Sequence, residues 1–299
     1  MQVVAIDLGS NSLTIIKYDC QKKEIIKSFM QNVRTAQGLV NSKKISQEAV
    51  ERIINALNSA KEQIDFANAK IKAVTTQALR VALNASDVIE QIKAKTGVEF
   101  KVISAKEEGE LTLKAVKARL EKIGIEQNFV LVDIGGGSTE LSYYIDGKIY
   151  SKSFDLGIVT TANSCKSLKE IEQFVKEKSK EIAEFASRFD NKNLIFTATA
   201  GTPTTIAAMK HNLVYKTYNA NIVTGTKLTI KELDYYLQKL LSMSKQEREI
   251  TVGVGRDDLI VAGVIIFKEI YNILQKEEAI VIDDGLSAGV AISECESIK

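Results

Sequence analysis

The chain has 299 residues, 45% hydrophobic and 26% charged, a composition typical of a globular protein with two domains of ordinary size. Its net charge of +2 argues against general nucleic-acid binding, and no apolar run reaches the roughly 18 residues that a membrane-spanning helix needs. His211 is the only histidine, which argues against His-based phosphotransfer and a Ser-His-Asp triad. Acid–base chemistry therefore falls to carboxylates, and a divalent metal ion would be a hard one bound by oxygen.

The chain begins with a motif that it later repeats. Residues 2–19 read as an apolar strand, a turn rich in Gly, Ser and Asn, and an alternating strand. Residues 128–146 follow the same plan, and Asp7 then aligns with Asp133 and Ser12 with Ser138. The sequence therefore predicts two duplicated α/β domains.

Strand and helix patterns follow each copy of the motif. Ser46 is a suitable N-cap for a helix that runs to about residue 66, and residues 166–187 form the corresponding amphipathic stretch. Thr229 and Glu232 form a capping box that predicts a helix over 230–243. Further strands are expected at 71–75, 99–103, 193–197 and 278–282.

The segment 121–128 separates the two copies and is the expected boundary and hinge. It predicts an N-terminal domain over 1–122 and a C-terminal domain over 123–299. A last helix over about 286–299 is expected either to stay with the second domain or to pack back on the first.

The two turns resemble the phosphate-binding hairpins of the actin, Hsp70 and sugar-kinase superfamily. Six segments in order resemble, more narrowly, the exopolyphosphatase/guanosine pentaphosphate phosphatase (Ppx/GppA) family: AIDLGSNS, VTTQALRVALN, VISAKEEGELT, VDIGGGSTEL, TATAGTPTTIAAM and DDGLSAGV. This resemblance runs to about residue 290 and implies two actin-like (ribonuclease H-like) domains with a cleft between them. It also implies release of the terminal phosphate from polyphosphate or from guanosine pentaphosphate.

The two turns are the expected phosphate-binding elements. Small residues let the backbone approach an anion closely, and successive N–H groups in a tight turn form an anion-binding concavity. The predicted phosphate contacts in the turns are Gly9, Ser10, Asn11 and Ser12, and Gly135, Gly136, Gly137, Ser138 and Thr139.

Asp7 and Asp133 end the strands before these turns and are the predicted metal ligands. Mg²⁺ prefers oxygen ligands and keeps several waters, so two symmetric carboxylates could hold it directly or through water. Hydrogen bonding of each carboxylate to its own turn is the alternative.

Hydrolysis needs a base for the attacking water. The corner from Ile103 to Glu110 resembles the family's strand-to-helix corner, and Glu108 matches its proposed base, with Glu107 as a neighbour that could be confused with it. The family pattern usually has Glu-Ala-Arg where this chain has Glu108-Gly109-Glu110. Glu140 is a second carboxylate that could orient the water or the metal ion.

Further phosphate contacts are expected from basic side chains and from one helix start. Arg34 and Arg80 match basic positions that the family places near its cleft, and Arg binds phosphate through a planar fork. Gly201 and Thr202 precede Pro203, which suits the first turn of a helix, and a helix N-terminus favours an anion.

Two other functions fit the same phosphate turns: a kinase or ATPase of the wider superfamily, and a non-catalytic regulator that binds polyphosphate or nucleotide. No secretion signal is apparent, and Cys20, Cys165 and Cys295 are expected to be reduced thiols of a cytoplasmic protein. The sequence leaves the oligomeric state open, and the family resemblance points to a homodimer.

Overall fold

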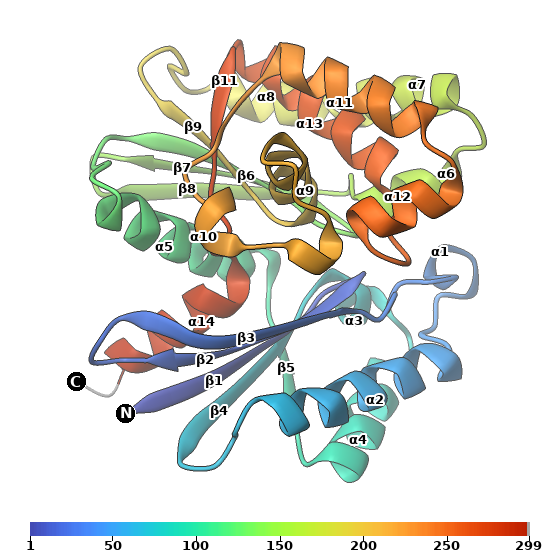
Figure 1. Ribbon diagram of the computed structural model, residues 1–299, viewed down its shortest axis with the longest axis vertical. Coiled ribbons are helices and arrows are strands. Elements are labelled where there is room, and N and C mark those ends of the chain that lie inside the picture. The colour runs from blue at the N-terminus through green and yellow to red at the C-terminus, as the bar shows by residue number, and fades with distance from the viewer. Residues whose placement is uncertain (298–299) are drawn as a thin grey trace. The chain divides into compact units, whose positions relative to one another are not determined.

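A computed structural model describes residues 1–297, in two compact units that each contain one β-sheet (Figure 1). The first unit comprises Met1–Ala115 and the chain from Gly285 onward, and the second comprises Val116–Asp284. The chain leaves the first unit inside a helix and returns to it after Asp284. Residues 298 and 299 of the predicted last helix lie outside the described residues.

The first unit has a five-stranded sheet in the order β3-β2-β1-β4-β5. Its strands are β1 (Gln2–Leu8), β2 (Ser12–Asp19), β3 (Glu24–Asn32), β4 (Ala69–Thr75) and β5 (Phe100–Val102). Its helices are α1 (Leu39–Ser42), α2 (Gln47–Gln63), α3 (Gln77–Val81), α4 (Ala85–Thr96), most of α5 (Ala105–Lys122) and α14 (Leu286–Glu296).

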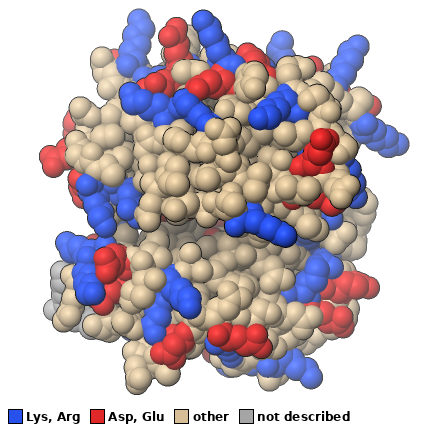
Figure 2. All heavy atoms as spheres, viewed as in Figure 1, with Lys and Arg blue, Asp and Glu red and all other residues tan. Residues whose placement is uncertain are grey.

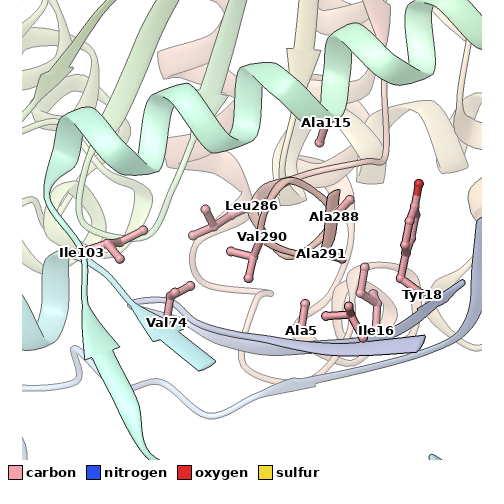
Figure 3. Close-up of a cluster of buried hydrophobic side chains, with 11 residues drawn as sticks. Ala5, Ile16, Tyr18, Val74, Ile103, Ala115, Leu286, Ala288, Val290 and Ala291 are labelled. Atoms are coloured by element: carbon pink, nitrogen blue, oxygen red, sulfur yellow. The ribbon is translucent and has the colours of Figure 1, made fainter. Parts of the chain in front are cut away.

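Helix α14 packs on one face of the first sheet, and α2 with α4 packs on the other (Figure 1). Figure 3 shows the core beneath α14, where Val290 and Ala291 lie against Ala5 and Ile16 of the sheet. Gly289 brings α14 close to α5, because a Cβ at this position would lie 1.9 Å from the carbonyl oxygen of Leu111. The described part of the predicted last helix therefore belongs to the first unit.

The second unit has a six-stranded sheet in the order β10-β11-β9-β6-β7-β8. Its strands are β6 (Phe129–Ile134), β7 (Thr139–Ile145), β8 (Lys148–Phe154), β9 (Ile195–Thr199), β10 (Lys227–Thr229) and β11 (Glu278–Val281). Its helices are α6 (Ile158–Ser164), α7 (Leu168–Lys178), α8 (Lys180–Ala186), α9 (Gly201–Lys210), α10 (Ala220–Val223), α11 (Ile230–Ser242), α12 (Lys245–Val252) and α13 (Ile260–Leu274), with a 3₁₀ turn η1 at Tyr215–Thr217.

The two sheets confirm the predicted duplication. In each, a three-stranded antiparallel meander (β1-β2-β3 and β6-β7-β8) pairs through its first strand with a parallel strand, β4 or β9, and a further parallel strand follows. Asp146 and Gly147 both have positive φ (50° and 79°), as a two-residue Asp-Gly hairpin turn requires. Local turn chemistry and strand alternation therefore specify the same meander twice.

The helix predictions are confirmed at their starts and corrected in one place. The Ser46 hydroxyl accepts a hydrogen bond from Ala49 N at the start of α2, and Thr229 with Glu232 closes the predicted capping box of α11. The stretch predicted over 166–187 is interrupted at Ser179, which ends α7 and begins α8. The Ser179 hydroxyl donates to the Lys176 carbonyl and to Glu269 of α13, so a tertiary contact competes with regular helix there.

The prediction of three reduced thiols is wrong for two of them. Cys20 and Cys295 form a disulfide with a Cα–Cα distance of 5.5 Å, and Cys165 is free. Within residues 1–297, no helix combines the length and the apolar character that crossing a bilayer would require.

Candidate active site

In the first unit, the candidate residues follow the carboxyl ends of three neighbouring parallel strands. β1 leads into the Gly9–Ser12 turn, β4 into α3 with Arg80, and β5 into α5 with Glu108. The Thr75 hydroxyl donates to the Leu8 carbonyl over 2.9 Å and ties the ends of β4 and β1 together. Ligands of open α/β sheets bind at such edges, so the sheet gathers these distant segments at one place.

A backbone hydrogen bond closes the Gly9–Ser12 turn, and two carbonyls of the turn accept hydrogen bonds from the segment that follows β3. Gly9 N donates to the Ser12 carbonyl (2.9 Å), Asn11 O accepts from Val33 N and Arg34 N (2.9 and 2.8 Å), and Ser10 O accepts from Ala36 N (2.8 Å). Within residues 1–297, the N–H groups of Ser10 and Asn11 have no hydrogen-bond acceptor. Both residues are buried, so an anion would supply acceptors that these amides otherwise lack.

The second turn repeats this arrangement in the second unit. Gly135 N donates to the Ser138 carbonyl (2.9 Å), and the carbonyls of Gly135 and Gly136 accept from Ile158 N and Val159 N (3.0 and 2.8 Å). A Cβ on Gly157 would lie 2.4 Å from backbone atoms of Gly136 and Gly137, so this close packing requires glycine. The duplicated sequence therefore gives a second turn closed by the same backbone hydrogen bond as the first.

Asp7 contains a buried acceptor with no partner. Its Oδ1 atom accepts no hydrogen bond from the described residues, and burial raises the pKa of the carboxyl to about 7. An unsatisfied buried carboxylate oxygen fits a hard cation, whose charge would offset the cost of ionisation. Among the described residues, no group of three or more His, Cys, Asp or Glu side chains is placed to hold a metal ion.

Asp133 is the counterpart of Asp7 and lies directly across the β6–β7 ladder from Glu140. Glu140 is 3% exposed, and its Oε1 atom accepts hydrogen bonds from the hydroxyls of Ser138 (2.7 Å) and Ser153 (2.6 Å). Glu140 thus holds the second turn through Ser138. The Thr139 hydroxyl donates to the Leu156 carbonyl, so this side chain fixes the turn from within the protein.

Glu108 lies in the first turn of α5, where Ser104 caps the helix. Glu107 N donates to Ser104 Oγ (3.1 Å), and Glu108 N donates to the Ser104 carbonyl (2.9 Å). The Glu108 side chain is 12% exposed and forms an ion pair with Arg80 at 3.1 Å. Glu107, by contrast, pairs with Lys101, and its side chain is 40% exposed. The structure therefore separates two neighbours that the sequence could confuse.

The two predicted arginines occupy different surroundings. Arg34 follows β3 with positive φ (49°) and is tied through its amide to the Gly9–Ser12 turn. Arg80 donates to Glu108, to Gln77 and to the Ile103 carbonyl. Its hydrogen bonds thus go to protein acceptors around Glu108, a role that the predicted phosphate contact did not include.

In the second unit, α9 begins at Gly201, directly after β9, with Pro203 in its first turn as predicted. The Thr202 side chain is fully buried, and its hydroxyl lies where a Cβ on Gly263 of α13 would be. The Thr202 hydroxyl is therefore packed against α13, and the backbone N–H is the group of Thr202 that could donate a hydrogen bond to an anion.

The sequence reasoning missed a cation at this helix start. Arg256 is 8% exposed, donates to the Gly201 carbonyl over 2.5 Å, and forms no ion pair within residues 1–297. Burial lowers the pKa of its guanidinium, which marks the cost of an unpaired buried charge. The segment VGVGRDD, with Arg256 between glycines and aspartates, was the available signal.

Two acids follow β11 at the same edge of the second sheet. Asp283 accepts a hydrogen bond from the Tyr218 hydroxyl (2.5 Å), and burial raises its pKa to about 6. Asp284 forms an ion pair with Arg119 (2.6 Å), and its carbonyl accepts from the Thr199 hydroxyl. Both carboxylates therefore have protein partners that fix this end of the sheet.

On the face shown in Figure 2, Lys and Arg side chains are interspersed with Asp and Glu. Attraction of a polyanion would therefore depend on the backbone amides and on individual arginines.

Comparison with known proteins yields a consistent group of relatives. The sequence model of the Ppx/GppA phosphatase family matches residues 14–298. Exopolyphosphatase 2 of Mycobacterium tuberculosis is 28% identical, over 98% of this chain and 98% of that protein. The bifunctional 3-dehydroquinate synthase/phosphatase of Fusobacterium nucleatum is 24% identical over 98% of this chain, but the chain spans only 46% of that protein's length.

A solved structure extends this likeness to the fold. The crystal structure of the Ppx/GppA family member of Aquifex aeolicus superposes with a TM-score of 0.78 at 29% identity, and the match covers 100% of this chain and 99% of that one. The agreement confirms the predicted fold class of two duplicated actin-like, ribonuclease H-like α/β domains.

Proposed function

Because the chain belongs to the Ppx/GppA phosphatase family, we propose that it hydrolyses terminal phosphoanhydrides with Glu108 as the general base. Inorganic polyphosphate is the first proposed substrate, since a relative of matching length is named an exopolyphosphatase. Guanosine pentaphosphate, which would be converted to the tetraphosphate, is the second. The same family membership favours a phosphatase over a kinase.

The ion pair between Arg80 and Glu108 carries the assignment of the base. It holds a mostly buried carboxylate at the sheet edge where the Gly9–Ser12 turn presents two amides without acceptors. A positioned base typically contributes about 10²- to 10⁴-fold to a rate. Glu107 is not held in this way, because its side chain is more exposed than that of Glu108 and is paired with Lys101.

In the proposed reaction, a water oxygen attacks the terminal phosphorus while the bond to the bridging oxygen breaks. Glu108 accepts the proton that the water loses, and the shortened chain leaves with the bridging oxygen. The amides of Ser10 and Asn11 bind phosphate oxygens, and Arg34 adds positive charge beside the same turn. In the second unit, the Gly135–Ser138 turn, the start of α9 and Arg256 offer further phosphate contacts.

Mg²⁺ is the proposed cofactor, with Asp7 and Asp133 as its protein ligands. The buried Asp7 oxygen without a hydrogen bond supports this choice. When bound, the ion would neutralise charge on the phosphate oxygens. Asp7 and Asp133 would bind the ion through carboxylate oxygens near the ends of the equivalent strands β1 and β6.

Phosphate release from polyphosphate and from guanosine pentaphosphate, with Mg²⁺ and with EDTA, tests the proposal. Glu108→Gln should lower kcat at least 100-fold. Glu107→Gln is the matched control, because it changes the adjacent carboxylate on the same helical turn, and it should stay within about 2-fold of the wild type.

Equal activity of Glu108→Gln and the wild type would remove Glu108 from the reaction. Tight polyphosphate binding without phosphate release would favour a regulator, and transfer of labelled phosphate from ATP to an acceptor would favour a kinase.

A homodimer and a cytoplasmic location are further proposals, for light scattering and cell fractionation to test. The disulfide weighs against a reducing compartment, where such bonds are rare.

A further inference from the structure

All five N–H donors of Arg80 have protein acceptors. Nε donates to Gln77 Oε1 (3.2 Å), and one Nη atom donates to Gln77 Oε1 (2.9 Å) and to Glu108 Oε2 (3.1 Å). The other Nη atom donates to Glu108 Oε2 (3.2 Å) and to the Ile103 carbonyl (2.7 Å). Since a guanidinium has five N–H groups, this arrangement uses every one.

The three acceptors fix different edges of the guanidinium plane. Glu108 occupies the edge between the two Nη atoms, and Gln77 occupies the edge between Nε and the nearer Nη atom. The Ile103 carbonyl holds the remaining N–H. Only Gln77 among them is a neutral side chain, so it orients the guanidinium without competing with Glu108 for its charge.

Gln77 is placed for this task by the short helix α3. It is the first residue of α3, three positions before Arg80, a spacing that brings two side chains to the same face of a helix. Helix α3 directly follows β4, while Ile103 and Glu108 lie at the end of β5 and the start of α5. The hydrogen bonds of Arg80 therefore connect the end of β4 with the end of the neighbouring strand β5.

We propose that Gln77 is a positioning residue that holds the Arg80 guanidinium in the plane that fixes Glu108. This role rests on the proposed function of Glu108 as the base. Loss of the Gln77 oxygen would free one edge of the guanidinium, and Glu108 would then sample orientations that do not meet the attacking water. Because the turn amides are the proposed substrate contacts, kcat would change and KM would not.

The test compares steady-state phosphate release from polyphosphate by five single variants and one double variant. Gln77→Met keeps the side-chain length but removes the acceptor, and it should lower kcat about 10-fold with KM within about 2-fold. Gln77→Glu restores an oxygen acceptor and should recover at least about one third of the wild-type kcat. Gln91→Met, at an exposed glutamine on α4, is the matched control and should be unchanged.

Arg80→Met and the double variant Gln77→Met/Arg80→Met decide whether Gln77 acts through Arg80. If it does, Gln77→Met should cost nothing further once Arg80 is absent. The same loss in both backgrounds, or wild-type kcat in Gln77→Met, would overturn the proposal. A rise in KM alone would likewise contradict it, because that would make Gln77 a substrate contact.

Glu108→Gln, measured in parallel, separates this inference from the proposed function. If Glu108→Gln is inactive and Gln77→Met is normal, only the positioning role fails. If Glu108→Gln is fully active, the proposed base fails and Gln77 has no catalytic role. Thermal unfolding then checks the contacts themselves: the shifts caused by Gln77→Met and Glu108→Gln should be non-additive with Arg80 present and additive in Arg80→Met.

Discussion

Cys20, in the turn after β2, and Cys295, in the last turn of α14, are joined by a disulfide across 275 residues of sequence. The bond attaches the far end of α14 to the sheet that this helix covers, close to the core of Tyr18, Ala288 and Ala291. The first unit is thereby closed covalently, although its two segments come from opposite ends of the chain.

Reduction of this bond should lower the free energy of unfolding. A crosslink that closes so long a loop restricts the unfolded chain, and removal of a native disulfide typically costs about 2–5 kcal/mol. Urea unfolding with and without dithiothreitol measures the effect. Cys295→Ser should resemble the reduced wild type and respond no further to reductant, while Cys165→Ser should unfold like the oxidised wild type. Identical midpoints for oxidised and reduced protein would contradict the role of the bond.

Asp7→Asn should stabilise the metal-free protein at pH 8. The pKa of Asp7 is raised to about 7 in the folded state, compared with about 3.9 in an unfolded chain, so the folded state binds more protons between these values. The stabilising contribution of the protonated carboxyl is complete below about pH 4 and is lost as the pH rises through 7.

Urea unfolding in EDTA at pH 5 and pH 8 tests whether the free energy of unfolding falls as the pH rises. The wild type should lose about 1–3 kcal/mol relative to Asp7→Asn between the two pH values. If Asp7 binds Mg²⁺ as proposed, added Mg²⁺ should stabilise the wild type at pH 8 and leave Asp7→Asn unchanged. An equal pH dependence in both proteins would show that the carboxyl titrates normally.

Gly157→Ala should displace the second phosphate turn. The new Cβ would lie 2.4 Å from backbone atoms of Gly136 and Gly137, and backbone cannot yield as a flexible side chain would. We expect a loss of about 1–3 kcal/mol in stability, as for overpacked cores, together with a raised KM for polyphosphate. Gly9→Ala is the comparison for stability, because its Cβ would meet only the Ser12 carbonyl at an ordinary 3.5 Å. Equal melting temperatures of Gly157→Ala and Gly9→Ala would refute the close contact.

The local sequence predicted much of the fold and, within the candidate site, the two glycine-rich turns. The alternation of β1 and β2, the small residues of Gly9–Ser12 and their repetition at Gly135–Ser138 predict the meanders and turns, because strand register and turn type depend on neighbours in sequence. The break at Ser179 could not be predicted this way, since its partner Glu269 lies on another helix.

The residues that the sequence alone determined are those whose roles are backbone roles: the two glycine-rich turns, the Ser46 N-cap, the capping box of Thr229 and Glu232, and the start of α9. Tertiary structure decided which side chains meet. It joined Cys20 to Cys295, assigned Arg80 to Glu108 and Gln77, and buried Arg256 beside Gly201. The physical reason is that a turn or cap is formed by adjacent residues, whereas an ion pair or disulfide depends on strand order, which brings the ends of β4 and β5 together and returns α14 to the first sheet.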